Sequence, residues 1–436
     1  MSPTDTTATV VATTTATQEV EQRKPLWERR LTRVFWVNSV AISKDGSRVV
    51  AGTYIHDYDN KNGGTFLPNI HSRFGLYIFD DVPKAETTDR VDPKCSDEFF
   101  GWDGVYGVAI SADGKIVAAS GWIDRNDDDT TVGLLRAYDA DISISAGTPK
   151  LLLDFKEIKT RVSWVSLSDD GRVLAAVADD VYIFIREGDA FNPVPLKLEV
   201  EEVAKKYVSG IAVDPSGNWV AACDHSGHVH VAKIKDGKIE DQVTWNADEE
   251  YPFLSVAIAS SVGKFVVGGG NLVFLFDLNG LMADRDSYKP LQLDTAENEP
   301  EGTVPPDKPD KLQENVRWVA TSTDAAVITV VVNRLKDKKL VGKLFALKAD
   351  LTPRWLPLEI ENTPNSTSVD AAGLFVAVAD GFFTSKPAKF YLFNASDGKP
   401  RWVSDTHSMN WPIVINSNAT AIVAGSDDGT VYYFTP

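Results

Sequence analysis

Sulfur-containing residues are scarce in this chain: its 436 residues include 2 Cys and 3 Met. Two cysteines are too few for a disulfide framework, and free thiols suit a reducing compartment, so we predict a cytoplasmic protein. No stretch reaches the roughly 18 apolar residues that a membrane helix needs. No Lys or Arg precedes Arg23 and the first residues lack an unbroken apolar segment, which is not the pattern of a secretory signal peptide. These absences predict that no membrane is a partner.

The chain has fewer basic than acidic residues. Lys and Arg number 44 against 62 Asp and Glu, which gives a formal net charge of -18. Such a surface repels phosphate backbones, so we predict that nucleic acid is not a partner. Aromatic residues are plentiful by contrast, with 11 Trp and 20 Phe. Large rings together with few methionines indicate a stiff interior that is built from strands rather than helices.

One sequence unit recurs along the chain. An apolar run ends in a turn, often Asp-Gly, then a second run of small and β-branched residues follows, and a third run alternates aromatic and aliphatic residues. The first copy reads VNSVAISKDGSRVVAGT from Val37, and the second reads VYGVAISADGKIVAAS from Val105. Apolar runs that are bounded by turn residues at a fixed period predict the strands of a repeat protein.

The turn of each copy marks the register of the repeat. The turn residues are Gly46, Gly114, Gly171, Gly217, Gly263, Ala325, Gly373 and Ala419. The shortest spacing is 46 residues, as between Gly171 and Gly217, which is about the length of one four-stranded propeller blade. Larger spacings indicate insertions into the same unit.

The N-terminal segment predicts how the ring closes. A fourth strand ends each unit and often opens with Pro, which suits the first residue of an edge strand. The eighth copy stops at Pro436 without this strand, whereas the segment Lys24–Trp27 (KPLW) matches Lys399–Trp402 (KPRW). We therefore predict an all-β, closed β-propeller of eight four-stranded blades, with the N-terminal strand completing the last blade. Residues 23–436 are expected to form this single domain, and residues 1–22 a disordered Thr/Ala-rich tail.

The repeats resemble the WD40-like and quinoprotein-alcohol-dehydrogenase-like superfamily of β-propellers. The segment Ser39–Thr53 with its aromatic third strand is similar to a WD40 repeat, and GKPRW at Gly398–Trp402 is similar to the quinoprotein type. The resemblance spans about residues 24–436 and implies the propeller fold. No third strand ends in Trp-Asp and no vicinal cysteine pair is present, so it implies neither the WD40 hydrogen-bond network nor a bound quinone. A fold shared in this way does not carry a function with it.

Insertions gather on one face of the predicted propeller. The loops between second and third strands and the connections between blades share a face that we call the top face. This face receives the insertions at 54–74, 122–131, 333–341 and 380–388 and the connection at 295–315. Elaborated loops on a rigid scaffold are usual sites of binding. We therefore predict a non-enzymatic scaffold that holds a protein or peptide partner with its top-face loops.

Aromatic residues and two arginines stand where the first strands begin. The candidate binding residues at the top face and channel mouth are Trp36, Trp102, Arg161, Tyr207, Tyr251, Arg317 and Trp411. Trp164 and Trp318 occupy the same place in their units. Such side chains can anchor a peptide or stack on a sugar, so a carbohydrate-binding propeller is a second hypothesis. Packing between blades is the alternative role for each ring.

Catalytic motifs are missing from the sequence. It has no Gly-x-Ser-x-Gly elbow, no phosphate-binding Gly loop and no zinc-protease helix, so no catalytic residues are predicted and the chain is not expected to be an enzyme. The alternative is a lyase, hydrolase or oxidoreductase with its site at the central channel mouth. His56, His71 and His407 are the histidines that neighbouring blades would bring together there.

Two acidic segments place oxygen ligands at alternate positions, as calcium loops do. The candidate ligands are Asp57, Asp59, Asp124, Asn126 and Asp128. Both segments lack part of the calcium-loop pattern, so no cofactor is predicted and calcium is the one that the sequence leaves open. Cys223, His228 and His230 are residue types that bind zinc, but their segment aligns with an ordinary turn and third strand.

Overall fold

The structure of the protein is a computed structural model. It describes residues 20–32, 36–55, 73–80, 91–100, 103–125, 130–141, 147–198, 208–247, 252–285, 287–295, 314–336, 339–381 and 387–436. Within these ranges the regular secondary structure is almost entirely strand, with the short helix α2 (Leu278–Ala283) and a 3-10 turn at Ser260–Val262. The prediction of an all-β chain is confirmed. No helix in the described ranges is long and apolar enough to cross a membrane.

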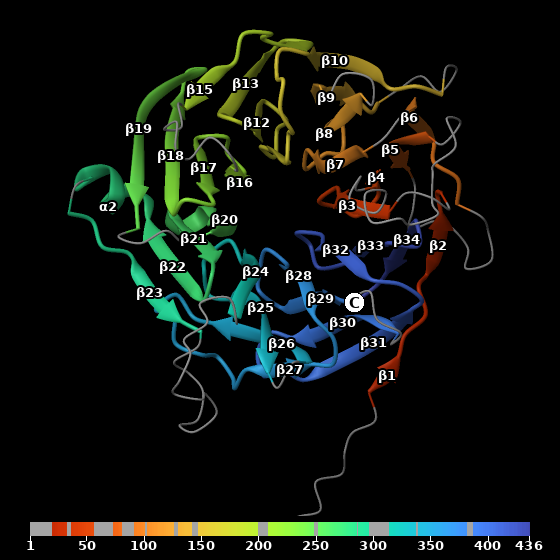
Figure 1. Ribbon diagram of the computed structural model, residues 1–436, viewed down its shortest axis with the longest axis vertical. Coiled ribbons are helices and arrows are strands. Elements are labelled where there is room, and N and C mark those ends of the chain that lie inside the picture. The colour runs from red at the N-terminus through yellow and green to blue at the C-terminus, as the bar shows by residue number, and fades with distance from the viewer. Residues whose placement is uncertain are drawn as a thin grey trace, which may run out of the picture.

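The strands form successive antiparallel sheets around a common centre (Figure 1). The first sheet contains β3 (Trp36–Ile42), β4 (Val49–Ile55), β5 (Arg73–Phe79), β6 (Cys95–Phe100), β7 (Asp103–Ile110), β8 (Ile116–Arg125), β9 (Thr130–Asp139) and β10 (Lys150–Phe155). Its strands β3 to β6 and β7 to β10 are two units of four, which are joined because β4 also pairs with β7.

The units that follow form sheets of their own. The next two sheets contain β11 (Trp164–Leu167), β12 (Val173–Val177), β13 (Val181–Glu187), β14 (Ala190–Phe191) and β15 (Leu196–Leu198), and then β16 (Val208–Val213), β17 (Trp219–Asp224), β18 (His228–Lys235) and β19 (Lys238–Asn246). The two after these contain β20 (Phe253–Ala259), β21 (Lys264–Gly269), β22 (Leu272–Asp277) and β23 (Leu291–Asp294), and then β24 (Glu314–Thr321), β25 (Ile328–Lys336), β26 (Lys339–Leu347) and β27 (Leu358–Ile360). The last two contain β28 (Pro364–Val369), β29 (Phe375–Asp380), β30 (Ala388–Asn394) and β31 (Pro400–Thr406), and then β32 (Asn410–Ile415), β33 (Ile422–Ser426) and β34 (Thr430–Phe434).

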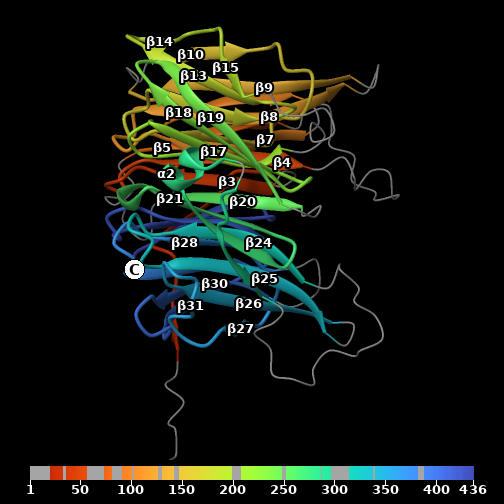
Figure 2. The same cartoon turned by 90° about the vertical axis from the view of Figure 1, so that its left-hand side faces the viewer.

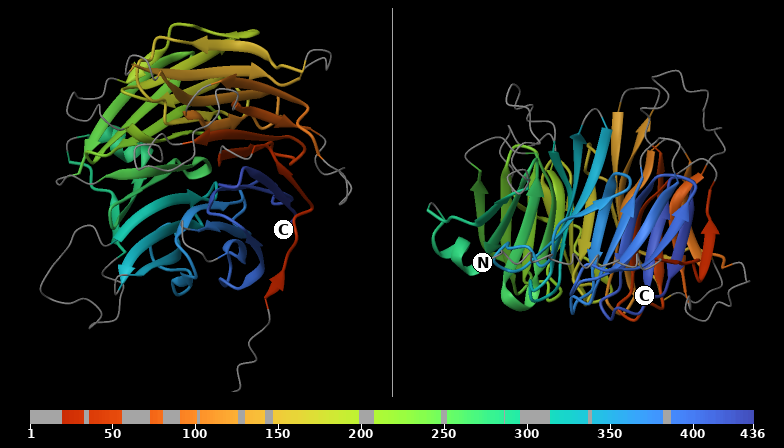
Figure 3. Two further views of the ribbon diagram at one scale, coloured as in Figure 1. Left: turned by 45° about the vertical axis from the view of Figure 1, so that its right-hand side comes forward. Right: turned by 90° about the horizontal axis from the view of Figure 1, so that it is seen from below.

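Two N-terminal strands join the sheets formed by the other end of the chain. β1 (Glu21–Gln22) pairs in parallel with β31, and β2 (Trp27–Arg30) pairs antiparallel with β34. In the second pairing Trp27 lies opposite Tyr433, and their stacked rings have centroids 5.5 Å apart. β3 also contacts β32 and β33, so the first and last units are neighbours (Figure 3). Because Glu21 is already paired, the paired part of the chain begins before Arg23, the predicted start of the domain.

The core lies between neighbouring sheets. Figure 2 shows the sheets side by side, and a sheet that is covered on both faces needs strands that are apolar throughout. All five residues of β12 are buried accordingly. One cluster of buried residues joins β12 and β13 to Val208 and Val220 of the next unit. Another joins Val49 and Phe79 of the first unit to Val423 of the last.

The turns between first and second strands share one backbone conformation. The eight residues predicted to mark the repeat register all have positive φ, from 54° at Ala419 to 78° at Gly46. This left-handed conformation costs glycine little and is unusual for alanine, which occupies it at Ala325 and Ala419. The register of the repeat that was predicted from the turns therefore agrees with the structure.

Two of the predicted top-face loops are mostly strand. The ladder of β8 and β9 continues to Arg125 opposite Thr130, and the ladder of β25 and β26 continues to Lys336 opposite Lys339. The prediction of loops at 122–131 and 333–341 is therefore wrong for most of their length. The β-branched residues of these hairpins favour continued pairing over a loop. The other predicted insertions lie mainly outside the described residues.

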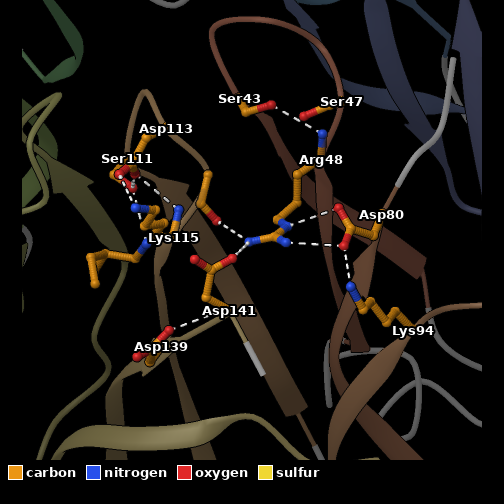
Figure 4. A network of polar contacts seen from close by, with 12 residues as sticks. Ser43, Ser47, Arg48, Asp80, Lys94, Ser111, Asp113, Lys115, Asp139 and Asp141 are labelled. Atoms are coloured by element: carbon orange, nitrogen blue, oxygen red, sulfur yellow. Dashed lines mark hydrogen bonds and ion pairs between the residues drawn. The ribbon is translucent and has the colours of Figure 1, made fainter. Parts of the chain in front are cut away.

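The face opposite the top face, which we call the bottom face, holds a network of ion pairs (Figure 4). The Arg48 side chain is 9% exposed and donates from Nε and Nη2 to Asp80 at 3.2 and 3.0 Å. Its Nη1 donates to the Gly114 carbonyl at 2.8 Å and lies 3.5 Å from an Asp141 oxygen. Lys94 also pairs with Asp80. Because Gly114 and Asp141 belong to the second unit, the network ties the first unit to its neighbour.

Candidate functional site

A cavity of about 610 Å³ lies on the top face, at the mouth of the central channel. Its walls are the ends of second strands, the starts of first strands and the connection that precedes β11. Six aromatic residues line it: Tyr54, Tyr106, Trp122, Trp164, Trp318 and Trp411. Cavities of this size with large apolar walls and a few polar groups are typical ligand sites.

Bulges in the first strands direct side chains toward this cavity. The ladders of five first strands slip by one or two residues near their top ends: in β7, β16, β20, β24 and β32 the slip passes over Tyr106, Ser209, Leu254, Arg317 and Trp411. A bulge leaves a residue without a ladder partner and re-aims its side chain. All five of these residues line the cavity. The repeat thus brings one position from each of five sheets to a single site.

The rings around the cavity contact one another edge to face. Ring centroids are 5.0 Å apart for Tyr54 and Tyr106, 5.2 Å for Tyr106 and Trp164, and 5.2 Å for Trp164 and Trp318. Such contacts add to the stability of buried rings and fix their orientation. The rings therefore form a continuous series of contacts, from Tyr54 of the first unit through Tyr106 and Trp164 to Trp318 of the sixth.

A second, deeper cavity of about 330 Å³ lies in the channel between the first strands. Trp164, Trp318 and Trp411 line both cavities. These three indoles therefore form the boundary between the open mouth and the channel below it.

The guanidinium groups of two arginines lie over tryptophan rings of the cavity. The Arg161 guanidinium carbon lies 4.9 Å from the Trp122 ring centroid, and that of Arg317 lies 5.2 Å from the Trp411 centroid. Burial lowers the pKa of Arg317 from its usual value, and the Tyr106 hydroxyl acts in the opposite direction. Burial raises the pKa of Tyr106, while the charges of Arg317 and then Arg161 oppose that rise. Both guanidinium groups thus lie close enough to the Tyr106 hydroxyl to act on it.

Several buried donors of the cavity have no hydrogen-bond partner within the described part of the chain. They are Arg317 Nε, Trp122 Nε1 and Trp411 Nε1. A buried donor that has lost water and gained no acceptor costs free energy, so native proteins contain few of them. Three such donors in one cavity mark it as a place where an acceptor is expected.

The cavity has the opposite charge to the chain as a whole. Its described lining contains Lys159, Arg161 and Arg317 but only one carboxylate, that of Asp179. The Tyr182 hydroxyl donates to this carboxylate at 2.8 Å. Burial lowers the pKa of His225, the remaining titratable group of basic type, which keeps it neutral at pH 7. The cavity is therefore cationic in a chain whose net charge is -18.

The binding residues predicted from the sequence fall into three groups by their position relative to the cavity. Arg161, Arg317 and Trp411 line the cavity. Trp36 lies beside it, with its ring 6.5 Å from that of Tyr54. Trp102, Tyr207 and Tyr251 lie outside the described residues. Their part in binding stays a prediction.

Sequence reasoning missed Tyr54, Tyr106 and Trp122, which complete the cavity. Tyr54 and Trp122 stand near the ends of second strands, where the pattern alone does not distinguish a strand end from a loop. Tyr106 stands at the bulge of β7. A usable signal was present, because the residue at the bulge is followed by Gly or Ser in several units, as in Tyr106-Gly107 and Leu254-Ser255.

The proposed calcium ligands are not placed by the structure. Asp57, Asp59, Asn126 and Asp128 lie outside the described residues, and Asp124 belongs to β8 but its side chain is not described. Among the side chains that are described, no three His, Cys, Asp or Glu residues gather as metal ligands would. Calcium therefore remains a prediction, and so does the histidine cluster, since His56 and His71 are also outside the described ranges.

The zinc candidates on β17 and β18 have structural roles. Asp224 is fully buried and lies 3.0 Å from Nδ1 of His228 and 3.1 Å from Nε2 of His230. His230 also contacts the Thr244 hydroxyl at 3.1 Å. Burial raises the pKa of Cys223 to about 12, so its thiol stays protonated and is a poor ligand. His228 and His230 thus belong to the third strand, as the alignment of their segment predicted, and both contact Asp224.

The family profile described as WD domain, G-beta repeat, matches residues 201–231. Solved propellers are similar over nearly the whole chain. Saccharomyces cerevisiae Sqt1 has a TM-score of 0.64 at 12% identity, covering 95% of this chain and 99% of that one. Chaetomium thermophilum Sqt1 bound to the N-terminus of the ribosomal protein L10 has a TM-score of 0.61 at 14% identity, covering 93% and 98%. No curated protein sequence matches the chain.

These likenesses and the sheet arrangement define the fold as a WD40-like β-propeller, as the resemblance implied. Identities this low show the fold alone, so the function has to be argued from the site.

Proposed function

We propose that the chain is a non-enzymatic scaffold that binds a protein or peptide partner through the cavity and the loops of its top face. The observation that carries this proposal is the convergence of bulge residues from five sheets on one cavity. Large rings and arginines in a central pocket are the side chains that anchor partners most strongly. A cavity of about 610 Å³ has room for a few side chains of a peptide.

A similar propeller supports a peptide as the kind of partner. Chaetomium thermophilum Sqt1 has been solved bound to the N-terminus of the ribosomal protein L10. That chain and this one share the fold at 14% identity, so the similarity supports the class of partner and not its identity.

The same proposal includes a closed ring of eight blades in the domain predicted at residues 23–436, with the tail predicted at 1–22 shortened by the paired strand β1. The pairing of β2 with β34 supports closure, and so does the bond from Asn416 Nδ2 to the Lys44 carbonyl at 2.9 Å, which joins the last unit to the first. Closure covers the outer edge of the last unit with the N-terminal strand and gives the cavity rigid walls. Both cysteines are free and buried, which supports a reducing compartment, the cytoplasm.

Peptide selection tests the proposal. A random peptide library displayed on phage is selected against the full chain and against Ser163→Trp. Ser163 is half-buried in the cavity wall and bonds through its backbone N–H to Val177, so the larger side chain fills the cavity and spares that bond. Val262→Trp, on the bottom face where Val262 is 43% exposed, is the matched control.

We expect peptides that bind the natural chain and the Val262 variant and lose binding to the Ser163 variant. Failure to select any peptide, or peptides that bind all three proteins equally, would contradict the proposal. Binding of oligosaccharides on a glycan array, abolished by Ser163→Trp and without any selected peptide, would replace it with the carbohydrate-binding hypothesis.

A further inference from the structure

The chemistry of the cavity lining selects for a negatively charged ligand group. The described lining combines three basic side chains with one carboxylate, and that carboxylate already accepts a bond from Tyr182. The rest of the molecule has the opposite excess, with 62 acidic against 44 basic residues. A cationic cavity in an acidic protein attracts an anionic segment to one place and repels it elsewhere.

Arg317 keeps a donor for a ligand. A guanidinium that stacks on a ring uses its face, while its N–H donors lie in the plane of the group. The Arg317 guanidinium lies over the Trp411 ring, and its buried Nε has no acceptor within the described ranges. The Arg161 guanidinium lies over the Trp122 ring at the same cavity. The ring contact holds the Arg317 guanidinium at the cavity before a ligand arrives.

The unpartnered groups of the cavity are all donors. Besides Arg317 Nε they are the indole Nε1 atoms of Trp122 and Trp411, and neither atom can accept a hydrogen bond. A carboxylate is the matching group, because it carries only acceptors and pairs with a guanidinium through two parallel bonds. The aromatic walls add apolar surface around it.

We propose that the cavity recognises an acidic peptide segment, in which an Asp or Glu side chain pairs with Arg317, in the field of the nearby Arg161 charge, and an adjacent apolar side chain packs on the rings. This inference rests on the proposed function and names the chemistry of the partner. Arg317 is the central anion-binding residue, and Trp411 is a positioning residue that holds it.

Paired peptides test the inference. An array carries acetylated and amidated hexapeptides in pairs that differ only by Glu or Gln at the third position, with apolar and aromatic neighbours varied. The labelled full chain is applied, and the strongest pair is measured in solution by fluorescence anisotropy. A third arm carries the Gln peptides with a free C-terminal carboxylate in place of the amide.

We expect Glu peptides to bind at least about tenfold more tightly than their Gln partners, since charge-assisted bonds supply that much discrimination. Arg317→Gln should reduce the difference to less than about threefold. Arg172→Gln is the matched control, because Arg172 is an exposed bottom-face arginine whose side chain lies 3.7 Å from Asp170. It should leave the difference unchanged. Circular dichroism and thermal melting show that both variants are folded.

The outcomes separate the two proposals. Equal binding of Glu and Gln peptides, lost in Ser163→Trp, would overturn the acidic segment and leave the peptide scaffold standing. Preference for the free C-terminal carboxylate over internal Glu would overturn the side-chain source of the charge. No binding of any peptide to the natural chain would overturn the proposed function itself.

Discussion

Two arginines on opposite faces of the propeller show how differently the same residue can be used. On the bottom face, Arg48 has partners for Nε, Nη1 and Nη2 in Asp80 and the Gly114 carbonyl (Figure 4). On the top face, Arg317 stacks on Trp411 and its Nε has no partner in the described structure. The first arrangement holds two units together. The second leaves donors directed at a cavity, which is the condition of a binding site before its ligand arrives.

The difference extends to the rest of each face. In the bottom turns, the hydroxyls of Ser43, Ser111, Ser168 and Ser322 each donate to an Asp two residues later, at 2.6–2.7 Å. Neighbouring turns are also bonded in series, from Lys44 N–H to Ala112, from Ala112 to Asp169 and from Asp169 to Pro215. Pro215 has no N–H, so this series ends there. The bottom face thus satisfies its polar groups internally, whereas the top-face cavity does not.

The largest expected effect is on the bottom face. Arg48→Met should lower the free energy of unfolding by about 3 kcal/mol, because it leaves Asp80 with Lys94 as its remaining ion pair and the Gly114 carbonyl without a donor. Urea denaturation measures the change. Arg172→Met, which removes an exposed pair with Asp170, should change it by less than about 1 kcal/mol. Equal effects of the two variants would contradict the contrast between a buried network and a surface pair.

The second expected effect is on the pH dependence of stability. Burial raises the pKa of Asp380, at the top end of β29, to about 6, and hydrogen bonds from Tyr391 and the Lys389 N–H oppose this rise. A folded-state pKa above the ordinary 3.8 means that stability is lost as the pH rises from about 4 to about 6. Asp380→Asn should remove this loss, which amounts to about 2 to 3 kcal/mol.

Asp80 on the bottom face sharpens that test because its pKa moves the other way. Burial alone would raise it, but hydrogen bonds from Arg48 and Lys94 bring it down to about 2. Its contribution is therefore complete above about pH 4 and is lost as the pH falls toward 2. Chemical denaturation from pH 2 to 6 measures how the free energy of unfolding depends on pH. Asp80→Asn should remove this dependence below pH 4 alone, and Asp380→Asn should remove it between pH 4 and 6 alone. An effect of Asp80→Asn between pH 4 and 6, or of Asp380→Asn below pH 4, would contradict these assignments.

The third expected effect comes from a single turn. Ser168→Ala removes the donor to Asp170 and the acceptor for the Arg172 and Val173 N–H groups, and should cost about 1 to 2 kcal/mol. Ser163→Ala is the comparison on the top face, where the described contacts include a backbone bond but no hydrogen bond of the Ser163 hydroxyl. It should change the melting temperature little. A larger loss at Ser163 would show that the cavity wall is held as tightly as the turns.

The smallest expected effect has the opposite sign. Arg317→Met removes a half-buried cation and its unpartnered Nε, so the free energy of unfolding should rise by about 1 kcal/mol while binding of acidic peptides is lost. Thermal melting and anisotropy on the same protein measure the two changes. A loss of stability of similar size would mean that Arg317 supports the fold and would remove the reason for assigning it to a ligand.

The sequence predicts the bottom face better than the top face for a physical reason. A turn such as Ser43–Gly46 is specified locally, because a serine, an aspartate and a left-handed glycine stabilise it within a few residues. The repeat register therefore follows from the sequence. The bulge at Tyr106 leaves only a weak local signal, the Gly or Ser that follows the bulge residue in several units, and where its side chain points depends on the neighbouring sheets. The extension of β8 and β9 is pairing within one hairpin, and it was mistaken for a loop.

The candidate site was accordingly found in part. Arg161, Arg317 and Trp411 stand close to the starts of first strands, so their place in the repeat predicts the channel mouth. Tyr54 and Trp122 come from second strands and meet the others only in the folded protein, where their own ring centroids are 5.1 Å apart. The lack of acceptors for the three buried donors could not be predicted, because it is a property of the whole cavity.

The measurement that tests the central claim most directly is a crystal structure of the full chain with the tightest Glu-containing hexapeptide. The account predicts the Glu carboxylate within about 2.9 Å of the Arg317 guanidinium, with an adjacent apolar side chain against the tryptophans. A peptide bound away from the cavity, or bound there with its carboxylate directed away from Arg317 and Arg161, would contradict it.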